Sequence, residues 1–208
     1  EKVAKLISDG NVVGWFQGRS EFGPRALGNR SILADPRNPE MQKKLNLKIK
    51  YREGFRPFAP SVLEEDYSDF FEGNMMSPYM LMVKKIQEKI KISVPKEYWK
   101  LDYWNKLYTK RSKLQSITHV DFSARIQTVS KKTNRRYWEL INEFKKITDV
   151  GVLVNTSFNV RGEPIVNSPE DAFKCFMNTE MDVLVIGNFL YFKEEQTIKV
   201  DKQQFKND

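Results

Sequence analysis

Residues 151–189, GVLVNTSFNVRGEPIVNSPEDAFKCFMNTEMDVLVIGNF, decide the fold class. The stretch opens with a β-branched segment, 151–159, that is almost continuously apolar until its polar carboxyl end, which predicts a buried strand. A helix is expected over 168–179, because a capping serine precedes a proline and two acidic residues in the first turn. Two strands over 181–193 follow. Strands that alternate with helices predict an α/β or α+β fold, and open α/β sheets bind ligands at the carboxyl ends of their strands.

The rest of the chain continues this alternation, with no internal repeat and no low-complexity tract. The elements expected from apolar spacing and turn residues are helices over 2–8, 24–32, 38–49 and 134–147, strands over 11–18 and 77–86, one or two strands over 116–130, an extended stretch over 53–63 and an acidic turn or helix over 64–71. The 208 residues are interpreted as one domain, 1–208, with an insertion at about 84–113. The absence of an initiator Met suggests a piece cut from a longer chain.

Composition indicates a globular cytosolic protein rather than a disordered or membrane-spanning one. Hydrophobic residues make up 40% and charged residues 30% of the chain, and no apolar run approaches the length of a membrane span. Cys175 is the only cysteine and His119 the only histidine, which excludes disulfides and His/Cys metal clusters. The net charge is +8, but residues 84–113 hold ten Lys or Arg against three Asp or Glu, so the remainder is nearly neutral. We call residues 84–113 the basic segment and expect a solvated helical excursion there.

Four polar clusters fall in predicted loops or at strand ends. They are Arg19, Arg25 and Arg30; Lys50, Arg52 and Arg56; His119, Asp121 and Arg125; and Asn155, Ser157, Asn159 and Arg161. Each cluster alone is typical of a solvated surface. Guanidinium groups that converge would repel one another unless a multiply charged anion lay between them, and phosphate fits that requirement best. No P-loop, protein-kinase or nucleophile-elbow motif is present, and a Ser157–His119–Asp121 triad is the weaker interpretation of these residues.

Four long motifs in order resemble the carboxyl-terminal domain of the NodU-type O-carbamoyltransferases. They are GRSEFGPRALGNRSILADPR (18–37), IKYREGFRPFAPSV (49–62), THVDFSARIQTV (118–129) and VNTSFNVRGEPIVNSPEDAFKCFMNTEMDVLVIGNF (154–189). The resemblance covers most of the chain outside the basic segment and the last dozen residues. It implies a YrdC-like fold, a twisted mixed sheet with flanking helices, in which KYR and SFN look like the K-x-R and S-x-N signatures.

The resemblance also implies a reaction. In that family this domain uses carbamoyl phosphate and ATP with Mg²⁺ to form carbamoyl-adenylate, and an upstream actin-like ATPase-fold domain of the same natural chain transfers the carbamoyl group to an acceptor hydroxyl. The upstream domain is absent from this sequence, so activation without transfer is expected. The implied catalytic residues are Arg25, Lys50, Arg56, Arg125 and Ser157, and the implied substrate- and nucleotide-binding residues are Arg52, Asn159, Arg161, Asn155, His119, Asp121 and Arg30.

Several alternatives stay open at this point. Arg19 and Arg30 could equally form ion pairs with Glu21 or Asp35 that fix the loop, and His119 could be a structural residue. The family motif HVDGTAR has glycine and threonine where this chain has Phe122 and Ser123, which puts the nucleotide pose or full activity in doubt. The aromatics of the basic segment, Tyr98, Trp99, Tyr103, Trp104 and Tyr108, could stack RNA bases, although the confinement of charge to one segment argues against a nucleic-acid partner. A docking or regulatory domain of the same fold and a homodimer are further hypotheses.

Overall fold

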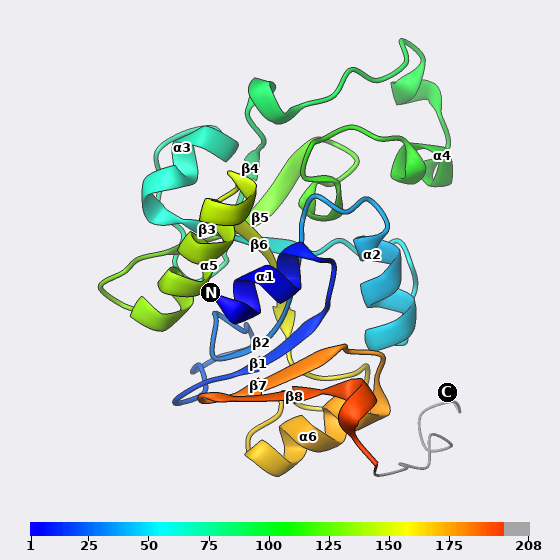
Figure 1. Ribbon diagram of the computed structural model, residues 1–208. Coiled ribbons are helices and arrows are strands. Elements are labelled where there is room, and N and C mark those ends of the chain that lie inside the picture. The colour runs from blue at the N-terminus through cyan, green and yellow to red at the C-terminus, as the bar shows by residue number, and fades with distance from the viewer. Residues whose placement is uncertain (198–208) are drawn as a thin grey trace.

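The computed structural model describes residues 1–197, which form one eight-stranded mixed sheet with helices on both faces (Figure 1). The strands are β1 (Val13–Phe16), β2 (Arg30–Ala34), β3 (Ala59–Leu63), β4 (Met82–Lys85), β5 (Ser123–Val129), β6 (Val152–Ser157), β7 (Val183–Ile186) and β8 (Phe189–Phe192). Their order across the sheet is β4-β5-β3-β6-β2-β1-β7-β8. Only the β1/β7 and β3/β5 pairs are parallel. The α/β fold expected from the sequence is confirmed.

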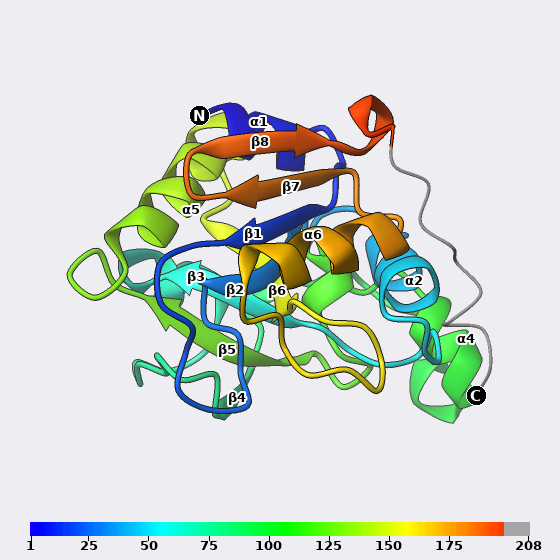
Figure 2. The same ribbon diagram turned by 90° about the horizontal axis from the view of Figure 1, so that it is seen from below.

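Two helical layers cover the sheet (Figure 2). The helices are α1 (Lys2–Ser8), α2 (Met41–Lys44), α3 (Tyr67–Phe70), α4 (Tyr103–Tyr108), α5 (Arg135–Thr148) and α6 (Pro169–Asn178), and a π-helical turn, Leu45–Ile49, extends α2. Short 3₁₀ turns lie at Glu64–Asp66, Glu88–Ile90, Tyr98–Lys100, Gln115–Ile117 and Lys193–Glu195. The helices α1 and α5 pack on one face against a core that includes Trp15, Leu33 and Leu153, while α2 and α6 pack on the other against Ile32, Val154 and Leu184.

The two long helices begin as their sequences predict. The side chain of Ser168 accepts from the backbone N–H of Asp171, whose own carboxylate accepts from the N–H of Ser168, a reciprocal capping box. Asn134 caps α5 by accepting from the N–H of Tyr137. The expected apolar face of α5 is buried in full, at Tyr137, Leu140, Ile141 and Phe144. These predictions are confirmed because the signals that start and orient a helix lie within one turn of it.

The expected helix over 24–32 is wrong: residues 21–29 form an irregular loop and Arg30 already belongs to β2. The reason is that a side chain, rather than helical carbonyl groups, accepts the hydrogen bonds of the loop's backbone N–H groups. The Glu21 carboxylate accepts from the N–H groups of Leu27 and Asn29, each at 2.7 Å. Gly28 has a φ of +111°, and a Cβ there would come within 2.2 Å of the Tyr137 ring, so only glycine fits.

The strand β6 also differs from the interpretation of its sequence. The strand is buried as predicted, but it pairs antiparallel with both β2 and β3, whereas the rule that ligands bind at carboxyl ends of strands applies to parallel sheets. It is apolar because it is central in the sheet and buried on both faces. The carboxyl end of β6 therefore lies beside the amino ends of β2 and β3, and this mixed edge carries the polar clusters.

The basic segment is largely exposed, as expected for a solvated excursion, but it is not a helical hairpin, and a few of its residues are buried. It begins with the last residues of β4, continues through 3₁₀ turns and contains α4 as its one α-helix (Figure 1). Its centre is Arg111, which is fully buried and donates to the carbonyl oxygens of Lys106, Leu107, Thr109, Thr118 and His119. Arg111 thereby joins α4 to the loop that precedes β5. Within residues 1–197 no helix combines the length and apolarity that a bilayer crossing requires.

Candidate active site

One edge of the sheet gathers residues from all four polar clusters. Ser157 at the end of β6 lies opposite Ser31 of β2, and Asn155 lies opposite Ala59 of β3. The strand β3 in turn pairs with β5, so Ser61 lies opposite Gln127. Adjacent strands are about 4.8 Å apart, which places the start of β5 about 10 Å from the end of β6. Sequence reasoning placed these residues at strand ends, and the strand order brings those ends together.

Lys50 is the most buried cation of the KYR and SFN motifs and links the two. It follows the π-helical turn directly, and its ammonium group donates to the backbone oxygens of Ser157 and Asn159 at 2.5 and 2.8 Å. It also donates to the Ser157 hydroxyl at 3.2 Å and to Asn159 Oδ1 at 2.9 Å. Burial, helped by the neighbouring charge of Arg52, lowers the pKa of Lys50 to about 7. The lysine thus fixes the shape of the SFN loop instead of projecting a free charge.

Arg25 and Arg125 form a pair of guanidinium groups without a carboxylate partner among residues 1–197. Arg25 is exposed in the loop before β2, and Arg125 is half-buried in β5, where its closest polar contact is the sulfur of Met80 at 4.0 Å. Burial lowers the pKa of Arg125, and the charge of Arg25 lowers it further. Two cations that interact electrostatically and have no carboxylate partner among the described residues can together bind an anion with several charged oxygens.

A buried polar network holds the loop that carries Arg25 against β5 and β6. Gln127 donates to the carbonyl oxygen of Leu27 at 2.8 Å, and Asn155 donates to that of Ala26 at 3.1 Å. Gln127 Oε1 accepts two hydrogen bonds, one from the Asn155 amide at 2.8 Å and one from the Ser61 hydroxyl at 2.5 Å. Gln127 and Asn155 are 4% and 1% exposed. Asn155 therefore supports the loop from inside the fold rather than facing a ligand.

Two of the three remaining arginines of the KYR and SFN regions, Arg56 and Arg161, contact the same carboxylate. Arg56 donates to Glu53 at 2.9 Å, and Arg161 lies 3.9 Å from the same carboxylate. Arg52 donates to Asn46 Oδ1 at 2.8 Å, and burial lowers its pKa. Glu53 consequently neutralises Arg56 and Arg161 in part, and these two are less available to an anion than Arg25 and Arg125.

Arg30 is a structural residue of the loop. Its guanidinium donates to the carbonyl oxygens of Gln17 and Gly18 and lies 3.5 Å from the centre of the Phe16 ring. Neither Arg19 nor Arg30 forms a direct ion pair with Glu21 or Asp35 in residues 1–197, although the charge of Glu21 favours the cationic form of Arg30, and burial outweighs it and lowers the pKa of Arg30. Asp35 pairs instead with Arg37. The Glu21 carboxylate accepts from the backbone N–H groups of Leu27 and Asn29 at 2.7 Å and from that of Arg30 at 3.4 Å.

His119 and Asp121 line a cleft of about 290 Å³ between the basic segment and the core. The other lining residues are Gln42, Phe55, Pro57, Tyr103, Leu107, Arg111, Ser116, Ile117, Thr118, Val120 and Ser123. Burial lowers the pKa of His119, which favours the neutral imidazole. Burial alone would raise the pKa of Asp121, but hydrogen bonds from Ser123 and Lys85 outweigh it and leave that pKa below its ordinary value. Phe122 is not among the lining residues.

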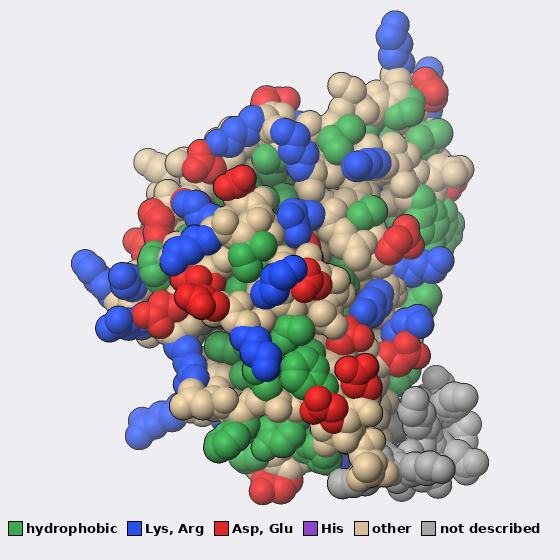
Figure 3. Space-filling view, in the orientation of Figure 1, with side chains coloured by type: hydrophobic (Ala, Val, Ile, Leu, Met, Phe, Trp, Pro, Cys, Tyr) green, Lys and Arg blue, Asp and Glu red, His purple; other side chains and the backbone are tan. Residues whose placement is uncertain are grey.

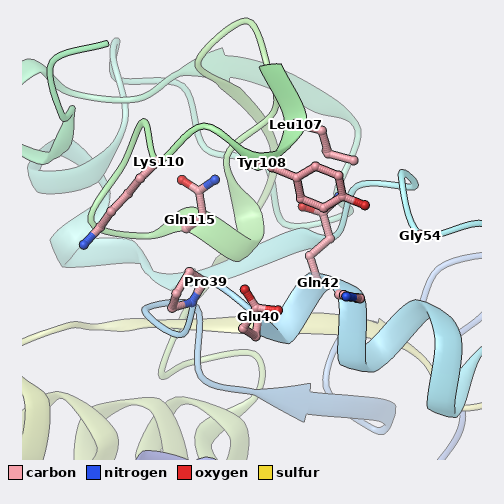
Figure 4. A pocket seen from close by; sticks show the side chains of 9 residues that line it. Pro39, Glu40, Gln42, Gly54, Leu107, Tyr108, Lys110 and Gln115 are labelled. Atoms are coloured by element: carbon pink, nitrogen blue, oxygen red, sulfur yellow. The ribbon is translucent and has the colours of Figure 1, made fainter. Parts of the chain in front are cut away.

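A second, smaller hollow of about 70 Å³ lies between α2 and α4 (Figure 4). It shares Gln42 and Leu107 with the cleft and is bordered by Glu40 and Tyr108. Its volume suits a few water molecules rather than a nucleotide. Of the two spaces beside α4, the cleft rather than this hollow has room for a small-molecule substrate.

The aromatics of the basic segment divide into a buried and an exposed group. Tyr98 is fully buried, whereas the others are 46–65% exposed: Trp99, Tyr103, Trp104 and Tyr108. The face of the molecule in Figure 3 shows Lys and Arg interspersed with Asp and Glu. A mixed surface of this kind gives no continuous basic track for nucleic acid on that face. Base stacking by the exposed rings stays a prediction.

Residues 1–197 contain no group of three His, Cys, Asp or Glu side chains that could hold a metal ion by itself. Sequence reasoning missed Gln127 and Arg111. Gln127 carried a usable signal, because it lies two residues after Arg125 on the same predicted strand and so shares its face. Arg111 carried none, since one more arginine in a basic run gives no indication that it is buried.

Comparisons with known proteins agree with this geometry. The family described as Carbamoyltransferase C-terminus matches residues 4–193. The chain is 48% identical to the nodulation protein NolO of Bradyrhizobium diazoefficiens over 95% of its own length, and 35% identical to the 3'-hydroxymethylcephem-O-carbamoyltransferase of Amycolatopsis lactamdurans over 94%. It covers 33% of each, so it spans about a third of the length of these curated relatives.

One solved structure has the same fold. The crystal structure of full-length HypF in the phosphate- and nucleotide-bound form superposes with a TM-score of 0.54, over 90% of this chain and 24% of that one. The sequence identity is 18%, so the likeness concerns the fold alone. It agrees with the twisted mixed sheet and flanking helices that the sequence motifs implied.

Proposed function

Because the chain belongs to the family of carbamoyltransferase C-terminal domains, we propose that it activates a carbamoyl group for transfer. Water cleaves the phosphoryl group from carbamoyl phosphate, which leaves carbamate and phosphate. A carbamate oxygen then attacks the α-phosphorus of ATP, and the bond from that phosphorus to the departing pyrophosphate breaks. The products are carbamoyl-adenylate, pyrophosphate and phosphate.

The observation that carries this proposal is the uncompensated pair of Arg25 and Arg125. Negative charge grows on the α-phosphate during attack and on the leaving pyrophosphate. Cations that are already in place lower this barrier, because no solvent has to reorganise around the new charge. The buried hydrogen bonds from Gln127 and Asn155 to the loop of Arg25 supply that preorganisation.

Lys50, Ser157 and Asn159 support the same chemistry in a different way. The Lys50 ammonium holds the backbone of Ser157 and Asn159, so the loop keeps its shape at the carboxyl end of β6. The Ser157 hydroxyl donates to Asn159 Oδ1 at 2.6 Å in the free protein and can turn toward a phosphate oxygen when one is bound. Arg52, Arg56 and Arg161 form the outer, partly neutralised rim.

Mg²⁺ fits this site only as part of the nucleotide. Magnesium is usually bound by one or two carboxylates together with substrate phosphates. The carboxylate nearest the cleft is Asp121, which already accepts from Lys85 and Ser123. Mg²⁺ bound to the triphosphate would supply further neutralisation of its charge, and the side chains described above would orient the phosphates.

Transfer to an acceptor requires more than this chain. The relatives it matches are about three times as long, and one of them is named for carbamoylating a hydroxymethylcephem. We assign the acceptor site to the part of such longer proteins that lies outside this domain, as an upstream transferase domain. The acceptor for this protein would then be a hydroxyl compound.

The test is pyrophosphate release from ATP, measured with carbamoyl phosphate and Mg²⁺. Arg25→Ala and Arg125→Ala should each lower the rate about 100-fold, by analogy with the loss of one preorganised donor. Lys50→Ala should also lower the rate, because the SFN loop loses the group that holds its shape, and Arg56→Ala should lower it less than Arg25→Ala, because Glu53 partly neutralises Arg56. Arg135→Ala is the matched control, because Arg135 is 74% exposed in α5 and pairs with Glu139. Equal rates in the wild type and the Arg25 and Arg125 variants would show that the assignment is wrong.

A further inference from the structure

The basic segment forms one wall of the cleft that contains His119 and Asp121. Tyr103, Leu107 and Arg111 belong to this segment, whereas Phe55 and Pro57 belong to the stretch that precedes β3. The cleft of about 290 Å³ lies at the lower end of the range for small-molecule sites, and it suits a nucleoside-sized group. Residues 84–113 lie outside the sequence motifs of the domain, so the motifs do not predict that this segment lines the cleft.

This wall is held firmly. Buried Arg111 joins α4 to the carbonyl oxygens of Thr118 and His119, on the floor of the cleft. Across the mouth, the ring of Tyr103 meets that of Phe55 edge to face at 5.9 Å, and the Tyr103 hydroxyl donates to the Phe55 carbonyl oxygen at 3.3 Å. The two rings, 46% and 38% exposed, leave apolar surface for a flat ligand to cover.

The charges in the cleft favour a neutral group over a phosphate. Asp121 is the carboxylate among the lining residues, and the N–H groups of the Arg111 guanidinium already donate to carbonyl oxygens. A phosphate there would meet a carboxylate and no available cation. A ribose hydroxyl or a base N–H, in contrast, can donate to Asp121, and a planar base can pack on the aromatic rings.

The strand β5 begins at the cleft and carries Arg125 further along the chain. Ser123 lines the cleft, Arg125 is two residues further on the same strand, and Gln127 is two beyond that, so their side chains share one face at about 7 Å intervals. Gln127 holds the loop that carries Arg25. A ligand with a neutral end in the cleft and an anionic end at Arg125 therefore matches the order of groups on the strand.

We propose that the cleft binds the nucleoside part of ATP, with Tyr103 and Phe55 against the base and Asp121 accepting from the nucleoside, and that the basic segment is thus the nucleoside wall of the site. This inference rests on the proposed function. It assigns the base and sugar to residues outside the KYR and SFN motifs and leaves the triphosphate to Arg25 and Arg125.

Calorimetric titration of the full natural chain with ATP, adenosine and inorganic tripolyphosphate separates the two ends of the ligand. Tyr103→Ala should weaken ATP and adenosine binding about tenfold and leave tripolyphosphate binding unchanged, because it removes one ring contact. Arg125→Ala should weaken ATP and tripolyphosphate and spare adenosine. Tyr79→Ala is the matched control, since Tyr79 is 66% exposed and does not line the cleft. Tyr103→Phe keeps the ring and should bind ATP as the wild type does.

The outcomes are distinct. If Tyr103→Ala binds ATP and adenosine as tightly as the wild type, or loses tripolyphosphate binding as well, the nucleoside assignment is overturned. Adenosine that does not bind the wild type at all, while tripolyphosphate does, overturns it too. In either case pyrophosphate release by the wild type would still stand as the separate measure of the proposed function.

Discussion

The ring of Phe122 packs against that of Tyr98 with their centres 5.8 Å apart, while the backbone of Phe122 has a φ of +63°. This left-handed conformation costs a non-glycine residue about 1 kcal/mol or more, which explains why related motifs have glycine at this place. In this chain the ring also contacts Trp99, at 6.1 Å. Phe122 therefore anchors the basic segment to the loop before β5, at the expense of local backbone strain.

Substitutions of Phe122 separate these two effects. Phe122→Ala loses the ring and keeps the strain, whereas Phe122→Gly loses the ring and relieves the strain. We expect the glycine variant to be more stable than the alanine variant by about 1 kcal/mol, measured by urea denaturation. Alanine and glycine variants of equal stability would contradict the strained backbone. Both should show faster hydrogen exchange in residues 91–101 than the wild type.

Lys50 makes stability depend on pH in the neutral to alkaline range. Its pKa is about 7 in the folded protein and 10.5 when unfolded, so between these values the unfolded state holds a proton that the folded state lacks. The free energy of unfolding should then rise with pH from about 7 to 10.5, by up to about 1.4 kcal/mol per pH unit, and should level off below pH 7, where both states hold the proton. Denaturation at pH 6 to 9 measures this slope.

Lys50→Met should flatten that slope, since it removes the titrating group. Lys48→Met is the control, because Lys48 is 55% exposed and pairs with Glu180 on the surface. If both variants keep the slope of the wild type, another group is responsible for it.

Gln127 should act as a positioning residue for Arg25. Gln127→Leu removes the donor to the Leu27 carbonyl and takes one acceptor away from the Ser61 hydroxyl and the Asn155 amide, which should cost about 1–3 kcal/mol of stability. We also expect tripolyphosphate affinity to fall severalfold, because the loop of Arg25 is no longer fixed. Thr179→Val is the matched control: it removes a buried hydroxyl that donates to the Cys175 carbonyl in α6, far along the chain from this loop. A loss of stability without a loss of affinity would mean that Gln127 is only structural.

Arg111 should be needed for the basic segment to stay ordered. Arg111→Met leaves the carbonyl oxygens of α4 and the loop before β5 without their donor, and we expect a loss of about 3 kcal/mol in a thermal or urea melt. Arg111→Lys should recover only part of this, since an ammonium group cannot span both sets of carbonyls. Arg135→Met, an exposed control, should change stability by less than about 0.5 kcal/mol. An Arg111→Met variant as stable as this control would contradict the role of Arg111.

The sequence by itself determined the elements whose signals are local. Sequence patterns predicted where two helices start, at Ser168 and Asn134, which face of α5 is apolar, and the two strands on either side of Gly187. They could do so because capping groups and apolar periodicity act within a few residues of one another. It also indicated which polar residues to examine, since glycines and prolines beside them fix the backbone shape.

Only the tertiary structure decided how those residues are used. Arg25 and Arg30 look alike in sequence, yet one faces solvent beside Arg125 and the other is tied to carbonyl oxygens. Lys50 looked like a free phosphate ligand but is held by the SFN loop 107 residues away. The physical reason is that hydrogen bonds and charge pairs across a sheet depend on strand order and register, which are set by the burial of the whole apolar surface rather than by any short stretch.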